Sequence, residues 1–286
     1  MTQSILITGA STGIGKAAAL LLDKSGYRVF AGVRKEKDAE TLRAQGTKNL
    51  QPIILDVMNT KHIDQAFEQV QAATSNKGLK ALINNAGYNY IEPFEMTDET
   101  KARAMMETNF FGLYKMSQRF LPLLRAYTDA HSDQANLINV GSIGSRIGFP
   151  WESFYHASKF AVLGFSESLR FELATQRIAV SAVLPGGIKT EFIGKALGEI
   201  NAGLEKFPVS NPYHKGLAKY AAMLPQAEKF GSPPEKVGQE ILRILQTAHP
   251  RLKYFVGTDA KIFNAMARFL PESWVHAIIR SQFIAS

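Results

Sequence analysis

The chain has 286 residues, of which 45% are hydrophobic and 20% are charged, and it contains no cysteine. This profile is that of a folded globular protein, and the lack of cysteine excludes disulfides, thiolate nucleophiles and cysteine-ligated zinc. The six histidines are scattered without a helical pair at metal-binding spacing, so we expect no metal site.

The formal net charge is +8, and residues 201–286 hold 11 Lys and Arg against 6 Asp and Glu. No run of adjacent basic residues exceeds two, so we expect no nucleic-acid role and attribute the excess to solvated faces and an anionic ligand. No apolar run approaches the ~20 residues that a membrane-spanning helix needs. Because no secretory leader precedes the first strand-like segment, we expect a cytoplasmic protein.

Strand-like apolar runs alternate with helical patterns along the chain. In order, these segments are Ile5–Thr8, Ala17–Asp23, Val29–Val33, Ile53–Asp56, Ile63–Ala73, Leu79–Asn84, Thr100–Leu124, Leu137–Val140, Ser153–Thr175, Ala179–Leu184, Val237–Thr247 and Leu252–Gly257. The strand runs are apolar throughout, which is typical of a parallel sheet with helices on both faces. We predict a single doubly wound α/β domain, a Rossmann fold, over residues 1–286.

Residues 189–230 interrupt this alternation with two helical patches, Phe192–Leu204 and Lys215–Leu224, separated by prolines. An insertion of this length is usually a lid or a binding loop, so we predict a substrate loop. Together with Phe149–Phe154, its apolar side chains suit a bulky apolar carbonyl or alcohol, although packing of the lid explains them equally well. These side chains belong to Phe192, Ile193, Leu197, Leu204, Phe207 and Tyr213. After the insertion, Ser232 followed by Glu235 predicts a helix N-cap.

A glycine-rich segment, Thr8-Gly9-Ala10-Ser11-Thr12-Gly13-Ile14-Gly15, joins the first strand to the first helix. Glycines let backbone amides approach a pyrophosphate at the helix N-terminus, although a glycine-rich turn into a packed helix has the same composition. Its position at the start of a βαβ series favours a dinucleotide site.

The second strand ends at Val33, where a site for NAD would carry an acid that binds the ribose 2′-hydroxyl. Arg34 and Lys35 follow instead, and their cations suit the 2′-phosphate of NADP. Glu36 and Asp38 come next, so a solvated charge cluster is the alternative interpretation. The pattern favours NADP over NAD.

Tyr155 and Lys159 stand four residues apart in a predicted helix and therefore share one face, and Ser142 precedes Tyr155 by thirteen residues. A free tyrosine has a pKa of about 10, and a nearby ammonium lowers that pKa by stabilising the phenolate. With a serine hydroxyl on the substrate oxygen, this trio passes a proton while a nicotinamide carries the hydride. We expect His156 to be structural.

These motifs resemble those of the short-chain dehydrogenases/reductases over essentially the whole chain. Within that family, the sequence is most similar to the steroid and retinol dehydrogenase branch. By this resemblance Tyr155 is the general acid/base, Ser142 polarises the substrate oxygen, and Lys159 lowers the tyrosine pKa and holds the nicotinamide ribose. Asn109 is similar to the family's fourth catalytic residue, which anchors a water beside the lysine. Thr12 departs from the pattern, because NADP members often place a basic residue there.

Together with Arg34 and Lys35, the residues that the resemblance assigns to the cofactor form a long set. They are Gly9, Ser11, Thr12, Gly13, Ile14, Gly15, Asp56, Val57, Asn85, Ala86, Gly87, Tyr155, Lys159, Pro185, Gly186, Ile188 and Thr190. Asp56 and Asn85 also suit turns after their strands. The family implies an NADP(H)-dependent oxidoreductase; an NAD-dependent alcohol dehydrogenase and a non-catalytic NADP(H) sensor are the alternatives.

The C-terminal segment 258–286 is predicted to be helical and is apolar with scattered cations. Such a segment usually covers a sheet edge or a subunit interface, although a basic amphipathic helix can also lie on a membrane surface. The resemblance implies a homodimer or homotetramer.

Overall fold

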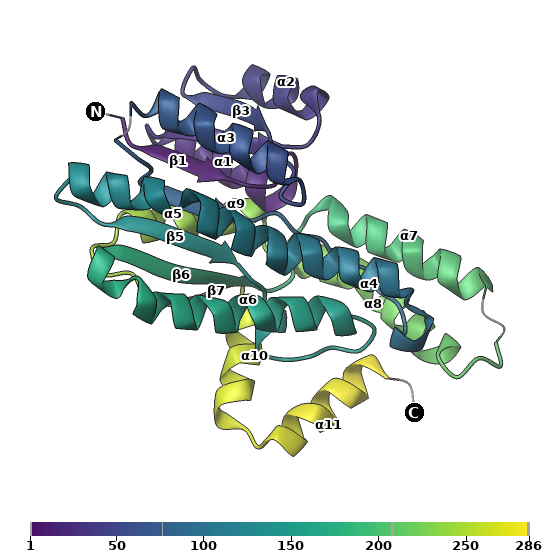
Figure 1. The fold of residues 1–286 in the computed structure, drawn as a ribbon. Helices are drawn as coiled ribbons and strands as arrows, with labels where there is room; N and C mark the ends of the chain where they lie inside the picture. Colours follow the sequence, from purple (N-terminus) through teal and green to yellow (C-terminus); the bar gives the residue numbers. More distant parts are fainter. Residues whose placement is uncertain (1, 76, 207–208, 285–286) are drawn as a thin grey trace.

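A parallel sheet runs through the protein in the strand order β3-β2-β1-β4-β5-β6-β7 (Figure 1). The computed structural model describes residues 2–75, 77–206 and 209–284, with the backbone alone at 191–193, 195, 206 and 226–228. The strands are β1 (Ser4–Ile7), β2 (Arg28–Val33), β3 (Leu50–Ile54), β4 (Ala81–Asn84), β5 (Ala135–Val140), β6 (Ile178–Pro185) and β7 (Lys253–Val256). The predicted Rossmann fold is therefore confirmed, and its strand order reverses at β1 and β4, where such sheets bind ligands.

Helices cover both faces of this sheet. The helices before residue 131 are α1 (Gly13–Lys24), α2 (Glu36–Gln45), α3 (Thr60–Ala73), α4 (Glu99–Met106) and α5 (Leu113–Ala130). The later ones are α6 (Ser153–Glu172), α7 (Glu191–Lys206), α8 (His214–Phe230), α9 (Pro234–Leu245), α10 (Thr258–Phe269) and α11 (Glu272–Phe283). Short helical turns lie at η1 (Phe94–Met96), η2 (Glu107–Gly112), η3 (Ile143–Ser145) and η4 (Ala174–Gln176).

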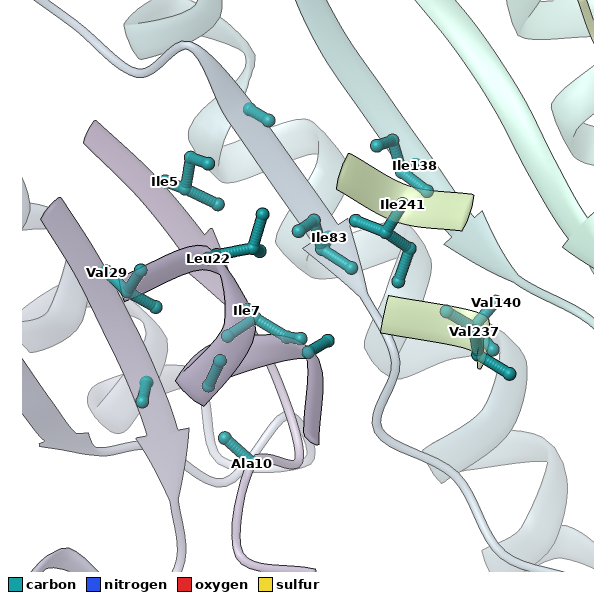
Figure 2. Packing of buried hydrophobic residues seen from close by; sticks show 14 of the residues in the cluster. Ile5, Ile7, Ala10, Leu22, Val29, Ile83, Ile138, Val140, Val237 and Ile241 are labelled. Atoms are coloured by element: carbon teal, nitrogen blue, oxygen red, sulfur yellow. The ribbon is translucent and has the colours of Figure 1, made fainter. Parts of the chain in front are cut away.

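Alternate strand residues pack into two separate cores. Figure 2 shows Ile7 of β1 and Ile83 of β4 in one core, with Leu22 of α1 and Ile241 of α9. Leu6 lies between Ile5 and Ile7 in β1 but belongs to the other core, on the opposite face of the sheet, with side chains of α3 and α5. Side chains of successive strand residues point to opposite faces, so apolar strand runs are required when both faces are covered.

Several predicted boundaries are wrong, and one helix is absent from the prediction. The helix α2 buries only Ala39 and Leu42, so its pattern is too weak to stand out in the sequence. The strand β3 begins three residues earlier than predicted, because Pro52 is tolerated at this edge of the sheet. The helix α9 begins at Pro234 with Pro233 as its N-cap, while Ser232 pairs with Ile188 in a β-bridge. Ser232 is thus not the predicted cap.

The insertion forms α7 and α8, which pack around a small apolar cluster that also includes Ile91. Leu197, Leu204 and Tyr213 lie against this cluster, which includes Leu217 and Tyr220. The side chains of Phe192 and Ile193, and the whole of Phe207, lie outside the described residues.

The C-terminal segment forms two helices, α10 and α11, in agreement with the helical prediction. They project from the body at the end of the sheet away from β3 (Figure 1). Phe263 and Val275 lie in a cluster with Ile147, which attaches both helices to the segment after β5. No helix in the described ranges combines the length and apolar character needed to cross a bilayer.

Candidate active site

The glycine-rich loop lies between β1 and α1, at the carboxyl edge of the sheet. Gly9 and Gly13 have φ angles of 66° and 55°, in the left-handed region that other residues rarely adopt. A Cβ added to Gly9 would lie 2.8 Å from the Cα of Ala86, so the loop runs directly against the segment after β4. The predicted glycine residues and Ala86 are therefore brought together at one edge.

Thr8 and Asn85 brace this loop. The Oγ1 of Thr8 accepts hydrogen bonds of 3.0 Å from the backbone N–H groups of Asn85 and Ala86. The Nδ2 of Asn85 in turn donates to the carbonyl oxygens of Thr8 at 2.9 Å and Gly9 at 3.0 Å. The side chain of Asn85 thus holds the loop in shape, and Thr8 is a supporting residue that the motif contains but the predicted site omits.

The first turn of α1 fits a pyrophosphate. Thr12 is the N-cap residue, but its side chain accepts no hydrogen bond from the first turn of the helix. This turn carries no acidic residue. A helix N-terminus presents unpaired N–H groups and a positive partial charge, which favour an anion. The end of β2 lies beside the loop that leads into this turn, because Ala10 N–H donates to the carbonyl oxygen of Gly32 at 2.9 Å.

Arg34 and Lys35 follow the end of β2 with exposed side chains. Neither forms an ion pair with the acidic residues that follow them in the described part of the chain; Glu36 pairs with Arg43. Exposed cations without such pairs are also what a solvated charge cluster would show, so this alternative stays open. The strand end that these cations follow lies beside the glycine loop, and their contact with a 2′-phosphate stays a prediction.

Asp56 and Val57 follow β3 at the same edge. The Oδ1 of Asp56 accepts a hydrogen bond from Met58 N–H at 3.0 Å, so this carboxylate does close the turn after its strand. Val57 is 5% exposed, and its side chain packs in the core with Ile63. Contacts of these residues with adenine stay a prediction.

The segment from Pro185 to Thr190 leaves the end of β6 and crosses toward the glycine loop. A Cβ on Gly13 would lie 3.2 Å from the Cγ2 of Thr190, so these two predicted residues are neighbours. Asp259 holds the segment from the other side, because its Oδ2 accepts a hydrogen bond from Gly187 N–H at 2.6 Å. A side chain on Gly186 would collide with that carboxylate at 2.1 Å, which explains the glycine. Sequence reasoning missed Asp259, which lies 72 residues further along the chain.

Ser142 and Tyr155 meet at the end of β5. Ser142 caps η3, and its Oγ accepts a hydrogen bond from Gly144 N–H at 3.0 Å. Burial raises the pKa of Tyr155 to about 12, a hydrogen bond with Ser142 lowers it in part, and the Glu152 carboxylate raises it further. The predicted lowering of this pKa by Lys159 is not seen: burial dominates, and Lys159 is not among the groups that shift it. Tyr155 is a protonated phenol at neutral pH, which is the form that donates a proton.

Lys159 lies one helical turn after Tyr155, and its Nζ is 5.7 Å from the centre of the tyrosine ring. This Nζ donates to the carbonyl oxygen of Val140 at 3.1 Å, and the residue is only 6% exposed. Burial lowers the pKa of Lys159 to about 8. The lysine therefore changes its charge in the mildly basic range.

Asn109 lies in η2, a wide helical turn between α4 and α5 that interrupts the single helix predicted over Thr100–Leu124. Its Oδ1 accepts from Tyr88 N–H and its Nδ2 donates to Tyr88 O, both at 2.9 Å, and Nδ2 also donates to Ser158 Oγ at 3.0 Å. A Cβ on Gly87 would lie 3.0 Å from Asn109 Oδ1 and 3.5 Å from Lys159 Nζ. Asn109 and Lys159 are thus both brought next to Gly87.

His156 is structural, as predicted. It is 6% exposed, its Nε2 accepts from Phe149 N–H at 2.9 Å, and its Nδ1 lies 2.9 Å from Gly144 O. An acceptor at Nε2 places the proton on Nδ1, so the ring ties the Ser142 segment to α6.

A buried carboxylate beside Tyr155 was not predicted. Glu152 is 9% exposed, accepts from Asn89 Nδ2 at 2.5 Å, and also accepts from the hydroxyl of Tyr220. Tyr220 comes from α8, so this contact ties the insertion to the start of the helix that carries Tyr155. The insertion also packs closely here, since a Cβ on Gly216 would lie 2.7 Å from the ring of Trp151.

Comparison with known proteins shows which family the chain resembles over most of its length. The family model described as short chain dehydrogenase matches residues 3–199. The chain is 31% identical to a 3-ketodihydrosphingosine reductase of Bacteroides thetaiotaomicron, over 97% of this chain and 97% of that protein. It is also 31% identical to retinol dehydrogenase 16 of Rattus norvegicus, over 96% of this chain and 86% of that protein.

Among solved structures, a short chain dehydrogenase from Burkholderia cenocepacia in complex with NADP is similar in fold. The match has a TM-score of 0.73 at 25% identity and covers 100% of this chain and 98% of that chain.

Proposed function

The chain belongs to the short-chain dehydrogenase/reductase family of oxidoreductases, and on that premise we propose that it transfers a hydride between NADP(H) and a bulky apolar carbonyl or alcohol. One observation carries this proposal: Ser142 contacts Tyr155, and Lys159 lies one helical turn after Tyr155, at the sheet edge that also holds the glycine loop.

Each residue of this site has its own role in a carbonyl reduction. When bound, the nicotinamide cofactor supplies the hydride. The hydroxyl of Ser142 hydrogen-bonds the substrate oxygen, and the phenol of Tyr155 donates its proton to that oxygen. Lys159, as an ammonium, stabilises the phenolate that remains, and Asn109 holds the Tyr88 backbone beside the lysine. The reverse oxidation uses the same groups in the opposite order.

The charge of Lys159 makes the reduction sensitive to pH. Because burial lowers the pKa of Lys159 to about 8, its ammonium is present below this pH and is lost above it. Tyr155 stays protonated across the same range, since its pKa is raised to about 12. We expect kcat of reduction to be flat toward neutral pH and to fall as pH rises through about 8.

A pH profile of the wild type and of Lys159→Arg checks this expectation. A guanidinium stays charged at every pH in the series, so any activity that Lys159→Arg keeps should lack the falling limb. A limb at the same pH in both proteins would assign the titration to another group.

The cofactor preference rests on Arg34, which follows Val33 where NAD-binding sites carry an acid. We expect Arg34→Ala to weaken NADPH binding by roughly 1.5–3 kcal/mol, the free energy of a charge-assisted phosphate contact. Binding of NADH should change little, because NADH has no 2′-phosphate. Titration with each cofactor, followed by intrinsic fluorescence, measures the two affinities. Lys48→Ala is the control, because it also removes one positive charge from an exposed position. Equal weakening of both cofactors would remove Arg34 from the 2′-phosphate site and favour the NAD-dependent alternative.

The substrate proposal rests on the insertion. The helix α8 lies against Trp151 and Glu152, three to four residues before Tyr155, and this position supports its role as one wall of the substrate site. The apolar cluster around which α7 and α8 pack suits a bulky apolar molecule. Turnover of NADPH against a panel of apolar ketones, aldehydes and alcohols tests this. Turnover confined to small polar carbonyls would contradict it.

The proposed assembly is a homodimer or homotetramer. Large apolar side chains are exposed on the neighbouring elements η2, α5 and α6: Phe111 at 40%, Tyr114 at 37%, Phe160 at 47% and Phe171 at 82%. Such exposure on helices is typical of a subunit interface. Light scattering after size exclusion measures the mass directly. The cytoplasmic location stays a prediction from the sequence.

A further inference from the structure

A hollow of about 580 Å³ lies at the β7 edge of the sheet, outside the predicted cofactor site. Seven residues line it: Arg146, Arg251, Lys253, Phe255, Lys261, Asn264 and Arg268. Five of the seven are cationic and none is acidic. The hollow therefore concentrates positive charge from three separate parts of the chain.

The fold explains how these side chains meet. In β7, Tyr254 and Val256 are buried in the core beside α9, so Lys253 and Phe255 point to the opposite face of the sheet. In α10, residues 261, 264 and 268 are three and four positions apart, which places Lys261, Asn264 and Arg268 on one helical face. Arg146 reaches the hollow from the end of η3.

Most of these cations have no acidic partner among the described residues. Within the described ranges, the cations of the hollow form one ion pair, between Lys253 and Glu167 of α6. The other acid nearby in sequence, Asp259, already accepts Gly187 N–H at 2.6 Å. Arg251 and Arg268 lie over the rings of Tyr254 and Phe269, each 5.3 Å from the ring centre.

Arg146 gives a second indication that a ligand belongs here. Its Nε is buried and has no hydrogen-bond partner in the described part of the chain. A buried donor without a partner costs free energy unless something else accepts its hydrogen bond. An anion in the hollow would accept from this guanidinium and reduce the repulsion among the neighbouring cations.

We propose that this hollow binds a phosphate group. Guanidinium groups match phosphate oxygens in a bidentate way, lysine ammonium groups add charge without a fixed geometry, and the amide of Asn264 adds a neutral donor. Several unpaired cations favour a group with more than one negative charge, such as a phosphate ester or a pyrophosphate. The site shares no residue with the predicted cofactor and catalytic set, so it does not depend on the proposed reaction.

Two sources can present this chemistry: a free phosphorylated compound, or the headgroup of an anionic lipid. Exposed apolar side chains adjoin the basic face in α10: Ile262 follows Lys261 and is 54% exposed, and Phe269 follows Arg268 and is 73% exposed. Basic and apolar side chains side by side on surface helices favour the lipid headgroup. A second copy of the chain would bring two such cationic surfaces together, which is unfavourable.

The test compares three forms of the full chain. The hollow variant is Lys261→Gln/Arg268→Gln, in which both side chains are exposed, so the fold should persist. The control is Lys24→Gln/Lys48→Gln, which removes the same charge from two exposed positions outside the hollow. Each form is titrated with sodium pyrophosphate by calorimetry, and co-sedimented with vesicles of phosphatidylcholine alone or mixed with phosphatidylglycerol.

We expect the hollow variant to bind at least one phosphate probe about tenfold or more weakly than the wild type, and the control to match the wild type. Binding of the mixed vesicles, reversed by pyrophosphate, identifies a lipid headgroup as the source. Binding of pyrophosphate without vesicle binding identifies a free phosphorylated compound. Equal affinities of all three forms for both probes would overturn the proposal. This is also the result expected if the probes bind only at the glycine loop, which all three forms share.

Discussion

Replacing Tyr155 by Phe is expected to lower kcat by about 10²- to 10⁴-fold, the range that positioned proton transfer contributes. The substitution removes only the phenol oxygen, and the ring keeps its place one helical turn from Lys159. The pKa of Tyr155, raised to about 12 by burial, means that the phenol carries its proton at neutral pH and is the donor during reduction. Without it, the alkoxide formed by hydride transfer has no acid in contact.

Cofactor binding separates this effect from a loss of folding. The glycine loop and the Arg34 segment lie at other strand ends, so Tyr155→Phe should bind NADPH almost as the wild type does. Tyr27→Phe is the matched control, because Tyr27 is partly buried just before β2 and is remote in sequence from the predicted catalytic set. Retained turnover in Tyr155→Phe would show that another group donates the proton. NADPH binding by a wild type that turns over nothing in the panel would favour the sensor alternative.

The glycine loop and the catalytic helix were predictable from the sequence because their signals are local. Gly9, Gly13 and Gly15 follow directly after an apolar strand, and Tyr155 and Lys159 share one helical face. The strand runs were visible because residues such as Leu6 and Ile7 are both buried, on opposite faces. Each of these features depends on residues within about two helical turns of one another.

The remaining features depend on contacts between distant parts of the chain. Glu152 meets Tyr220 across 68 residues, and Asp259 meets Gly187 across 72 residues. Neither pair has a local pattern, because an isolated Glu or Asp is usually a solvated surface residue. The pKa of Tyr155 was predicted in the wrong direction for the same reason, since burial by elements around it cannot be read from an i, i+4 pair. The basic hollow likewise needs Arg146 and Lys261 to be brought together by the β7 edge.

Gly15→Ala tests whether the glycine loop is built as tightly as the structure indicates. In an exposed helix the change from Gly to Ala is stabilising by about 1 kcal/mol, because Ala loses less backbone entropy. At Gly15, however, the added Cβ would lie 2.1 Å from the carbonyl oxygen of Gly9 and 2.5 Å from Asn85 Nδ2. The first of these is backbone and cannot rotate away. We therefore expect the free energy of unfolding to fall by about 1–3 kcal/mol, as for other overpacked sites.

The same substitution at Gly198 gives the opposite expectation. Gly198 lies in α7, and a Cβ there meets no atom within 4 Å, so Gly198→Ala should raise the free energy of unfolding by up to about 1 kcal/mol. Denaturant unfolding of both variants measures the two signs, and titration with NADPH measures the loop. Gly15→Ala must push Gly9 or Asn85 aside, so its affinity for NADPH should fall while that of Gly198→Ala should not. A Gly15→Ala protein with wild-type stability and affinity would mean that the loop relaxes freely, and its close packing would then not be what shapes the pyrophosphate site.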